Sequence, residues 1–126
     1  MAAHGIAQGE RFTRAERLRR RKEYERVYRE GKRLNLPYLK VVLAPNELGY
    51  CRLGLSVSRK FGKAVKRNLA KRRLREIFRR HKGLFPAGHD VIFIPKPGFL
   101  EQPQQKIIQD LAKIFQIYEK NRSVSR

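Results

Sequence analysis

The chain has 126 residues, which suits one domain with a single core and is too short for two. Its 31 Lys and Arg outnumber 11 Asp and Glu, and the resulting formal charge of +20 points to nucleic acid or an anionic membrane as partner. No apolar run approaches the roughly 20 residues that span a bilayer, and no secretory signal is recognisable. Because Cys51 is the single cysteine, an internal disulfide and a cysteine-based zinc cluster are excluded. We therefore expect a cytosolic protein that binds nucleic acid and no membrane.

The N-terminal part combines an unpatterned leader with a helix signal. Residues 1–12 show no periodicity, so we expect a disordered leader. Thr13 and Glu16 have the spacing of a capping box, which predicts a helix from Thr13 to about Glu30. Gly31 is placed to end this helix in a left-handed conformation.

Two tyrosines, Tyr24 and Tyr28, lie one turn apart on this predicted helix among many Arg and Lys residues. Bases of single-stranded nucleic acid stack on such rings, each worth roughly 1–3 kcal/mol, while cations follow the backbone. The alternative is that both rings pack on a sheet, in which case each buried hydroxyl needs a hydrogen-bond partner.

The sequence pattern in the middle of the chain predicts β-strands. Apolar residues alternate over residues 39–44 and 51–57, and the segment 45–49 between them has turn composition, so we predict that the two strands form a hairpin. Residues 91–94 form a continuous apolar run, which is typical of a strand buried on both faces.

Residues 59–82 are the most basic segment, because half of its 24 residues are Lys or Arg and only Glu76 opposes them. Helical spacing places four apolar residues on one stripe: Ala70, Leu74, Ile77 and Phe78. Another face repeats a cation every fourth residue: Arg67, Lys71, Arg75 and Arg79. Successive cations are then about 6 Å apart, near the phosphate repeat of a nucleic-acid strand. A solvated face is the alternative, but such a face mixes both signs of charge, so we favour a nucleic-acid surface.

The pattern of residues 104–118 predicts a third helix, whose apolar stripe should cover the sheet. Residues 121–126 are polar and expected to be loose. The predicted fold class is α+β, an α/β sandwich with helix, β-hairpin, basic helix, buried parallel strand and C-terminal helix in order. Residues 13–120 would form a single RNA-binding domain.

The sequence has few side chains that could catalyse cleavage of a phosphodiester bond. Asp90 and Asp110 lie on different predicted elements, and neither has an acid neighbour at a spacing that clasps Mg²⁺. His4, His81 and His89 form no i, i+4 pair, although an acid–base pair of histidines remains geometrically open. From the residues alone we predict a nucleic-acid-binding module without chemistry of its own, and the two tyrosines favour RNA over DNA.

Three blocks carry a family resemblance: RRRKEYERVYREG at residues 19–31, LGLSVSRK at 53–60 and KAVKRNLAKRRLRE at 63–76. Over residues 18–118 the chain resembles the protein subunit of bacterial ribonuclease P, and the third block is similar to the family's Arg-Asn-Arg helix. Leu69 departs from that signature, which typically has a third basic residue there, while Lys66 and Arg73 add charge nearby.

The resemblance implies a holoenzyme in which a catalytic RNA subunit uses Mg²⁺ to remove the 5′ leader from precursor tRNA. The protein would bind that RNA as a monomer in a 1:1 complex, with no metal bound tightly and no active site of its own. It also implies a left-handed crossover between parallel strands. The alternatives from the residues are a structural or ribosomal RNA-binding protein and a protein-only nuclease.

By position, the resemblance also implies two sets of binding residues. The single-stranded leader would lie in a cleft between the first helix and the sheet, bound by Tyr24, Tyr28, Val41, Lys60, Arg67 and Lys71. The RNA subunit would contact Lys63, Lys66, Arg67, Asn68, Arg72, Arg75 and Arg79.

Overall fold

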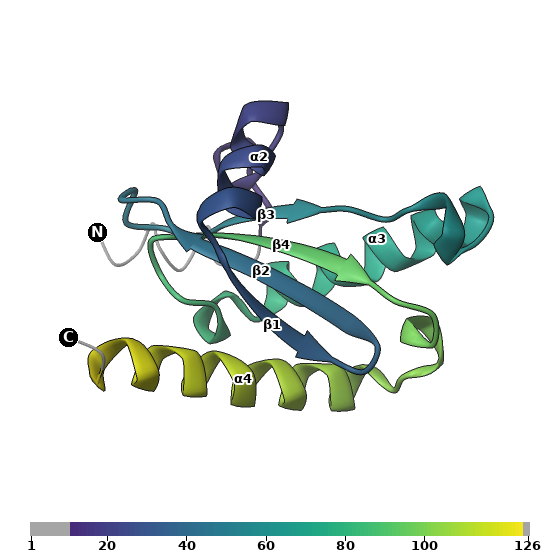
Figure 1. The fold of residues 1–126 in the computed structure, drawn as a ribbon. Helices are drawn as coiled ribbons and strands as arrows, with labels where there is room; N and C mark the ends of the chain where they lie inside the picture. Colours follow the sequence, from purple (N-terminus) through teal and green to yellow (C-terminus); the bar gives the residue numbers. More distant parts are fainter. Residues whose placement is uncertain (1–10, 125–126) are drawn as a thin grey trace.

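The computed structural model describes residues 11–124 and contains three α-helices and four strands in that range. In chain order they are α2 (Arg21–Glu30), β1 (Lys32–Leu36), β2 (Leu39–Pro45), β3 (Arg52–Leu55), α3 (Ala64–Arg80), β4 (His89–Pro95) and α4 (Gln104–Val124). The strands form one sheet, with α2 on one face and α3 and α4 on the other (Figure 1). The α+β class expected from the sequence is confirmed.

The sheet order is β1-β2-β4-β3, with β3 parallel to β4 and the other pairs antiparallel. The predicted hairpin between residues 39–44 and 51–57 is therefore wrong, because β4 lies between these two strands. The real hairpin joins β2 to β1, a polar edge strand that the apolar pattern did not reveal. The buried parallel strand is confirmed as β4, which is the most buried strand of the sheet and lies between β2 and β3. It follows β3 through α3, and the hand of this crossover stays a prediction.

The helix predicted from Thr13 begins instead at Arg21. The capping box of Thr13 and Glu16 does form, but it caps a single 3-10 turn, Arg14–Glu16. The chain then runs beside β3, where the Leu18 N–H donates to the Leu53 carbonyl at 2.9 Å.

Gly31 does end α2, but its φ of −82° is extended rather than left-handed. A Cβ there would lie 2.4 Å from the Val27 carbonyl oxygen and 2.9 Å from that of Leu43. Glycine is needed at this position because backbone from α2 and β2 approaches it closely.

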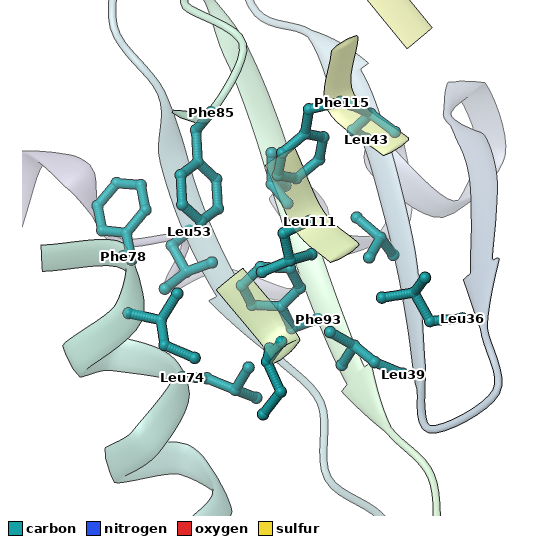
Figure 2. Packing of buried hydrophobic residues seen from close by; sticks show 14 of the residues in the cluster. Leu36, Leu39, Leu43, Leu53, Leu74, Phe78, Phe85, Phe93, Leu111 and Phe115 are labelled. Carbon is teal, nitrogen blue, oxygen red and sulfur yellow. The ribbon is translucent and has the colours of Figure 1, made fainter. Parts of the chain in front are cut away.

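The main core lies between the sheet and the helices α3 and α4. Figure 2 shows Leu74 and Phe78 of α3 and Leu111 and Phe115 of α4 directed into one cluster, which also contains Phe93 of β4. The apolar stripe predicted for the basic segment is confirmed, since all four of its residues are buried: Ala70, Leu74, Ile77 and Phe78. The helix itself is shorter than the basic segment, with His81 as its C-cap.

A smaller cluster lies under α2 on the opposite face. It contains Leu18, Val27, Val42, Ala44 and Ile92, with Tyr24, Tyr28 and Ile94 at its margin. Alternate residues of β2 thus serve different cores, because successive side chains of a strand point to opposite faces.

Both ends of the domain extend beyond the predicted limits. Phe12, assigned to the leader, packs edge-on against Phe78 with ring centroids 5.3 Å apart. The remainder of that leader, residues 1–10, lies outside the described residues. α4 continues to Val124, so residues 121–124 are helical rather than loose, and residues 125–126 are not described.

Candidate RNA-binding surface

α3 presents cations that have no acidic partner. Its one acid, Glu76, pairs with Arg79 at 2.7 Å and with Arg80 at 3.4 Å, and the hydrogen bond from Arg79 helps to hold the pKa of Glu76 below its usual range. Within the described part of the chain, Arg67 and Arg73 of α3 donate only to backbone carbonyls. Four further basic side chains of α3 in that range make neither an ion pair nor a side-chain hydrogen bond: Lys66, Lys71, Arg72 and Arg75. Their charge is therefore available to an external polyanion.

Two adjoining hollows border this cationic face. The first, of about 440 Å³, gathers four of the residues predicted to contact the RNA subunit: Asn68, Arg72, Arg75 and Arg79. The second, of about 330 Å³, reaches across β3 to Tyr24 of α2. Four residues line both hollows: Phe12, Arg17, Lys71 and Arg75. We call the two together the α3–α2 groove.

Tyr24 is both packed on the sheet and part of this groove. Its half-buried phenol oxygen accepts a hydrogen bond from the Leu55 N–H at 3.1 Å and lies 3.4 Å from the Leu18 carbonyl. Burial raises the pKa of Tyr24, so the phenol stays protonated. A Cβ at Gly54 would lie 2.9 Å from its Cζ and Oη, which shows how closely the ring approaches β3.

The other residues predicted for the leader cleft are more dispersed. Lys71 joins Tyr24 in the second hollow. Tyr28 is half-buried at the margin of the small cluster under α2, and Lys60 is exposed on the 3-10 turn before α3. Arg67 donates to the Gly62 carbonyl at 2.7 Å, so its guanidinium fastens the start of α3 to the preceding turn.

The assignment of Val41 to the cleft is corrected by the structure. Val41 is fully buried in the main core, whereas the tyrosines lie on the α2 face of the sheet. The β2 residues that share their face are Val42 and Ala44, one position along the strand. Val41 therefore cannot contact RNA bound beside α2.

The remaining predicted contacts lie toward the N-terminal end of α3. Lys63 is the N-cap of the helix and is exposed, and Lys66 is exposed one turn later. Lys66 borders a separate hollow of about 190 Å³ with Phe61 and Leu100. The predicted RNA-subunit residues therefore extend along α3 and do not share one hollow.

Asp90 holds α2 to the sheet through a network that the sequence did not reveal. Its carboxylate is fully buried and accepts from Arg52 Nε and Nη2 at 2.8 Å each, from Asn46 at 2.8 Å and from Arg26 at 2.9 Å. Arg52 also pairs with Glu23 at the start of α2 at 3.2 Å. Burial raises the pKa of Asp90, but these hydrogen bonds outweigh it and hold the pKa below its ordinary value.

The groups considered for catalysis are engaged elsewhere. His89 is buried, with Nε2 2.9 Å from the Tyr118 hydroxyl, and burial lowers its pKa. Asp110 accepts from Tyr38 at 2.7 Å and from Lys106 at 2.9 Å. Among residues 11–124, no three His, Cys, Asp or Glu side chains are placed to hold a metal ion. In the same range, no helix has the length and apolar character of a membrane span.

Comparison with known proteins identifies the family. The model of the Ribonuclease P family matches residues 12–119, nearly the whole described domain. The chain belongs to the ribonuclease P protein family. The ribonuclease P protein component of Thermotoga maritima is 50% identical over 93 residues, which cover 74% of this chain and 80% of that protein.

Solved structures of ribonuclease P proteins share the fold. The protein from Thermotoga maritima superposes with a TM-score of 0.72 at 40% identity, covering 79% of this chain and 94% of that one. The protein from Staphylococcus aureus superposes with a TM-score of 0.71 at 31% identity, covering 83% of this chain and 96% of that one. The family resemblance is confirmed, and with it a role as a ribonuclease P protein component, part of a tRNA-processing holoenzyme with an RNA subunit.

Proposed function

We propose that this protein binds both the RNA subunit of ribonuclease P and the single-stranded 5′ leader of precursor tRNA, while the RNA subunit performs the cleavage. The observation that supports this most strongly is the α3–α2 groove, which joins unpaired cations of α3 to an aromatic ring of α2. Cations that neutralise phosphates supply affinity, and a ring supplies a surface on which unpaired bases stack.

The two ends of the groove suit the two RNAs. Asn68, Arg72 and Arg75 lie on a rigid helix and can contact the backbone of a folded RNA subunit. Tyr24 and Lys71 lie where the groove crosses β3, which suits a single strand whose bases are exposed. A single protein would thus hold the leader beside the RNA that cuts it.

We assign the Mg²⁺ of the reaction to the RNA subunit. The two aspartates of this chain do not fit a metal site, since Asp90 is saturated by Arg26, Arg52 and Asn46 and Asp110 by Tyr38 and Lys106. We derive no step of the reaction through a metal on the protein. The proposal includes a cytosolic location and one protein monomer per RNA subunit.

The test compares holoenzymes reconstituted with protein variants, using precursor tRNA that carries its leader and mature tRNA that lacks it. Tyr24→Ala and Tyr28→Ala should each weaken binding of the precursor about tenfold, within the roughly 1–3 kcal/mol of one stacked base, and leave binding of mature tRNA nearly unchanged. Tyr24→Phe keeps the ring and should retain leader binding.

Tyr50→Ala is the matched control, because this exposed tyrosine lies on the β2–β3 loop and borders neither hollow of the groove. Its binding to both tRNAs should equal that of the wild type. Equal losses for precursor and mature tRNA in the Tyr24 and Tyr28 variants would rule out a leader site at α2.

A further inference from the structure

An aromatic ring and a guanidinium group form a stacked pair where the two hollows of the groove meet. The Cζ of Arg17 lies 4.3 Å from the centroid of the Phe12 ring, and its Nη2 donates to the Phe12 carbonyl at 3.3 Å. Phe12 in turn rests edge-on against the buried Phe78 of α3, at an interplanar angle of 67°. Both members of the Phe12–Arg17 pair line both hollows.

The segment that carries this pair is fastened at several points. Glu16 accepts from the Thr13 N–H at 2.9 Å and from Lys82 Nζ at 2.8 Å, which ties this 3-10 turn to the turn that follows α3. Arg17 forms an isolated bridge with Leu53 of β3. The Phe12–Arg17 pair is therefore a preorganised wall, and little conformational entropy is lost when a ligand binds against it.

The residues of α3 that line the first hollow have the groups that recognise a nucleotide. Arg72 and Arg75 offer guanidinium groups to a phosphate, and neither has a protein partner among the described residues. Asn68 offers an amide that can donate to and accept from a base edge. The volume of about 440 Å³ falls in the range of small-ligand sites.

We propose that this hollow takes one unstacked nucleotide of the RNA subunit, with its base against the Phe12–Arg17 pair and its phosphate on Arg72 and Arg75. Unpaired bases of folded RNA commonly stack on aromatic rings and on guanidinium planes, and the pair presents both. The RNA subunit is the source, because this hollow is lined by α3 and not by Tyr24. The proposal rests on the proposed function and adds Phe12 and Arg17 to it.

A simpler role for Phe12 is to cover Phe78 in the core. Two substitutions distinguish this packing role from the proposed stacking on a base. Phe12→Leu keeps an apolar side chain over Phe78 but removes the flat ring. Arg17→Lys keeps the charge but removes the guanidinium plane, which Lys cannot replace in stacking. Tyr50→Leu is the control, since it removes an exposed ring outside both hollows.

The experiment measures binding of the purified RNA subunit to the full-length variants over a series of salt concentrations, after thermal unfolding has confirmed that each variant is folded. Phe12→Leu and Arg17→Lys should each weaken binding about tenfold, as expected for one stacked base. The slope of log affinity against log salt should stay that of the wild type, because no phosphate contact is lost. Tyr50→Leu should bind normally.

Wild-type affinity of Phe12→Leu would overturn the proposal, and so would a loss accompanied by a smaller salt slope. The two variants are also tested in the precursor-binding assay described above. If they bind the RNA subunit normally and lose affinity only for leader-bearing precursor, the proposal is overturned, because the nucleotide would then belong to the leader. The proposed function has a separate readout in the Tyr24 and Tyr28 variants, so either idea can fail while the other stands.

Discussion

Replacing Asp90 should loosen the attachment of α2 to the sheet. Asp90→Ala removes the buried carboxylate that two guanidinium groups share, and leaves Arg26 with only the exposed Glu30 and Arg52 with only Glu23 as acidic partners. Breaking a buried ion pair in this way costs about 3–5 kcal/mol. The Arg26 and Arg52 side chains are 29% and 18% exposed, so water recovers part of the loss and we expect about 3 kcal/mol. For a domain of this size that lowers Tm by about 12 °C.

The pH dependence identifies the carboxylate as the cause. The pKa of Asp90 in the folded protein lies below its ordinary value, so the ionised form stabilises the fold. This contribution is complete above the ordinary aspartate pKa of about 4 and is lost as the pH falls through the lower folded value. Asp90→Asn should therefore differ most from the wild type at neutral pH, and the difference should shrink in acid.

The first assay is urea unfolding of the wild type, Asp90→Ala and Asp90→Asn from pH 7 down to about pH 3. The second assay measures binding of leader-bearing precursor and mature tRNA by the same proteins. Because α2 carries Tyr24 next to Glu23 of the network, the variants should bind leader-bearing precursor more weakly and mature tRNA nearly as before. Wild-type stability of Asp90→Ala at pH 7, or a loss independent of pH, would refute this reasoning.

Three further substitutions test the site. Gly54→Ala would place a Cβ 2.9 Å from the Tyr24 ring; the resulting overpacking should cost about 1–3 kcal/mol and weaken leader binding, as unfolding and precursor affinity would show. Arg72→Ala should reduce the salt slope of RNA-subunit binding by about one unit without changing Tm, whereas an unchanged slope would mean that Arg72 is merely solvated. Arg73→Ala is its matched partner: Arg73 donates to the Gln102 carbonyl at 2.9 Å, so this variant should lose stability rather than salt slope.

Helices with long, regular patterns could be predicted from the sequence, whereas strand pairing could not. The apolar stripe of α3, from Ala70 to Phe78, covers about two turns, and all of its residues are buried. The turn between β2 and β3 has the composition of a hairpin loop, but pairing depends on β4, which is distant in the chain. β1, KRLNL, has only two apolar residues, Leu34 and Leu36, because it is an edge strand and largely exposed.

The binding surface was predictable only where it depends on local spacing. Cations four residues apart on one helix must share a face, and the structure confirms that Lys71, Arg75 and Arg79 border one hollow. Val41 was misplaced because a shift of one residue reverses the face of a strand. Asp90 was considered only as a metal ligand, since its partners Arg52 and Arg26 lie 38 and 64 residues away and no local pattern links them.

The most direct measurement is release of the 5′ leader from precursor tRNA at physiological Mg²⁺ by the protein alone, by the RNA subunit alone and by both together. If the protein supplies a binding surface for a reaction performed by RNA, the protein alone should release no leader, and its addition to the RNA subunit should restore efficient maturation. Leader release by RNA-free protein, or no gain when the two are combined, would contradict the account.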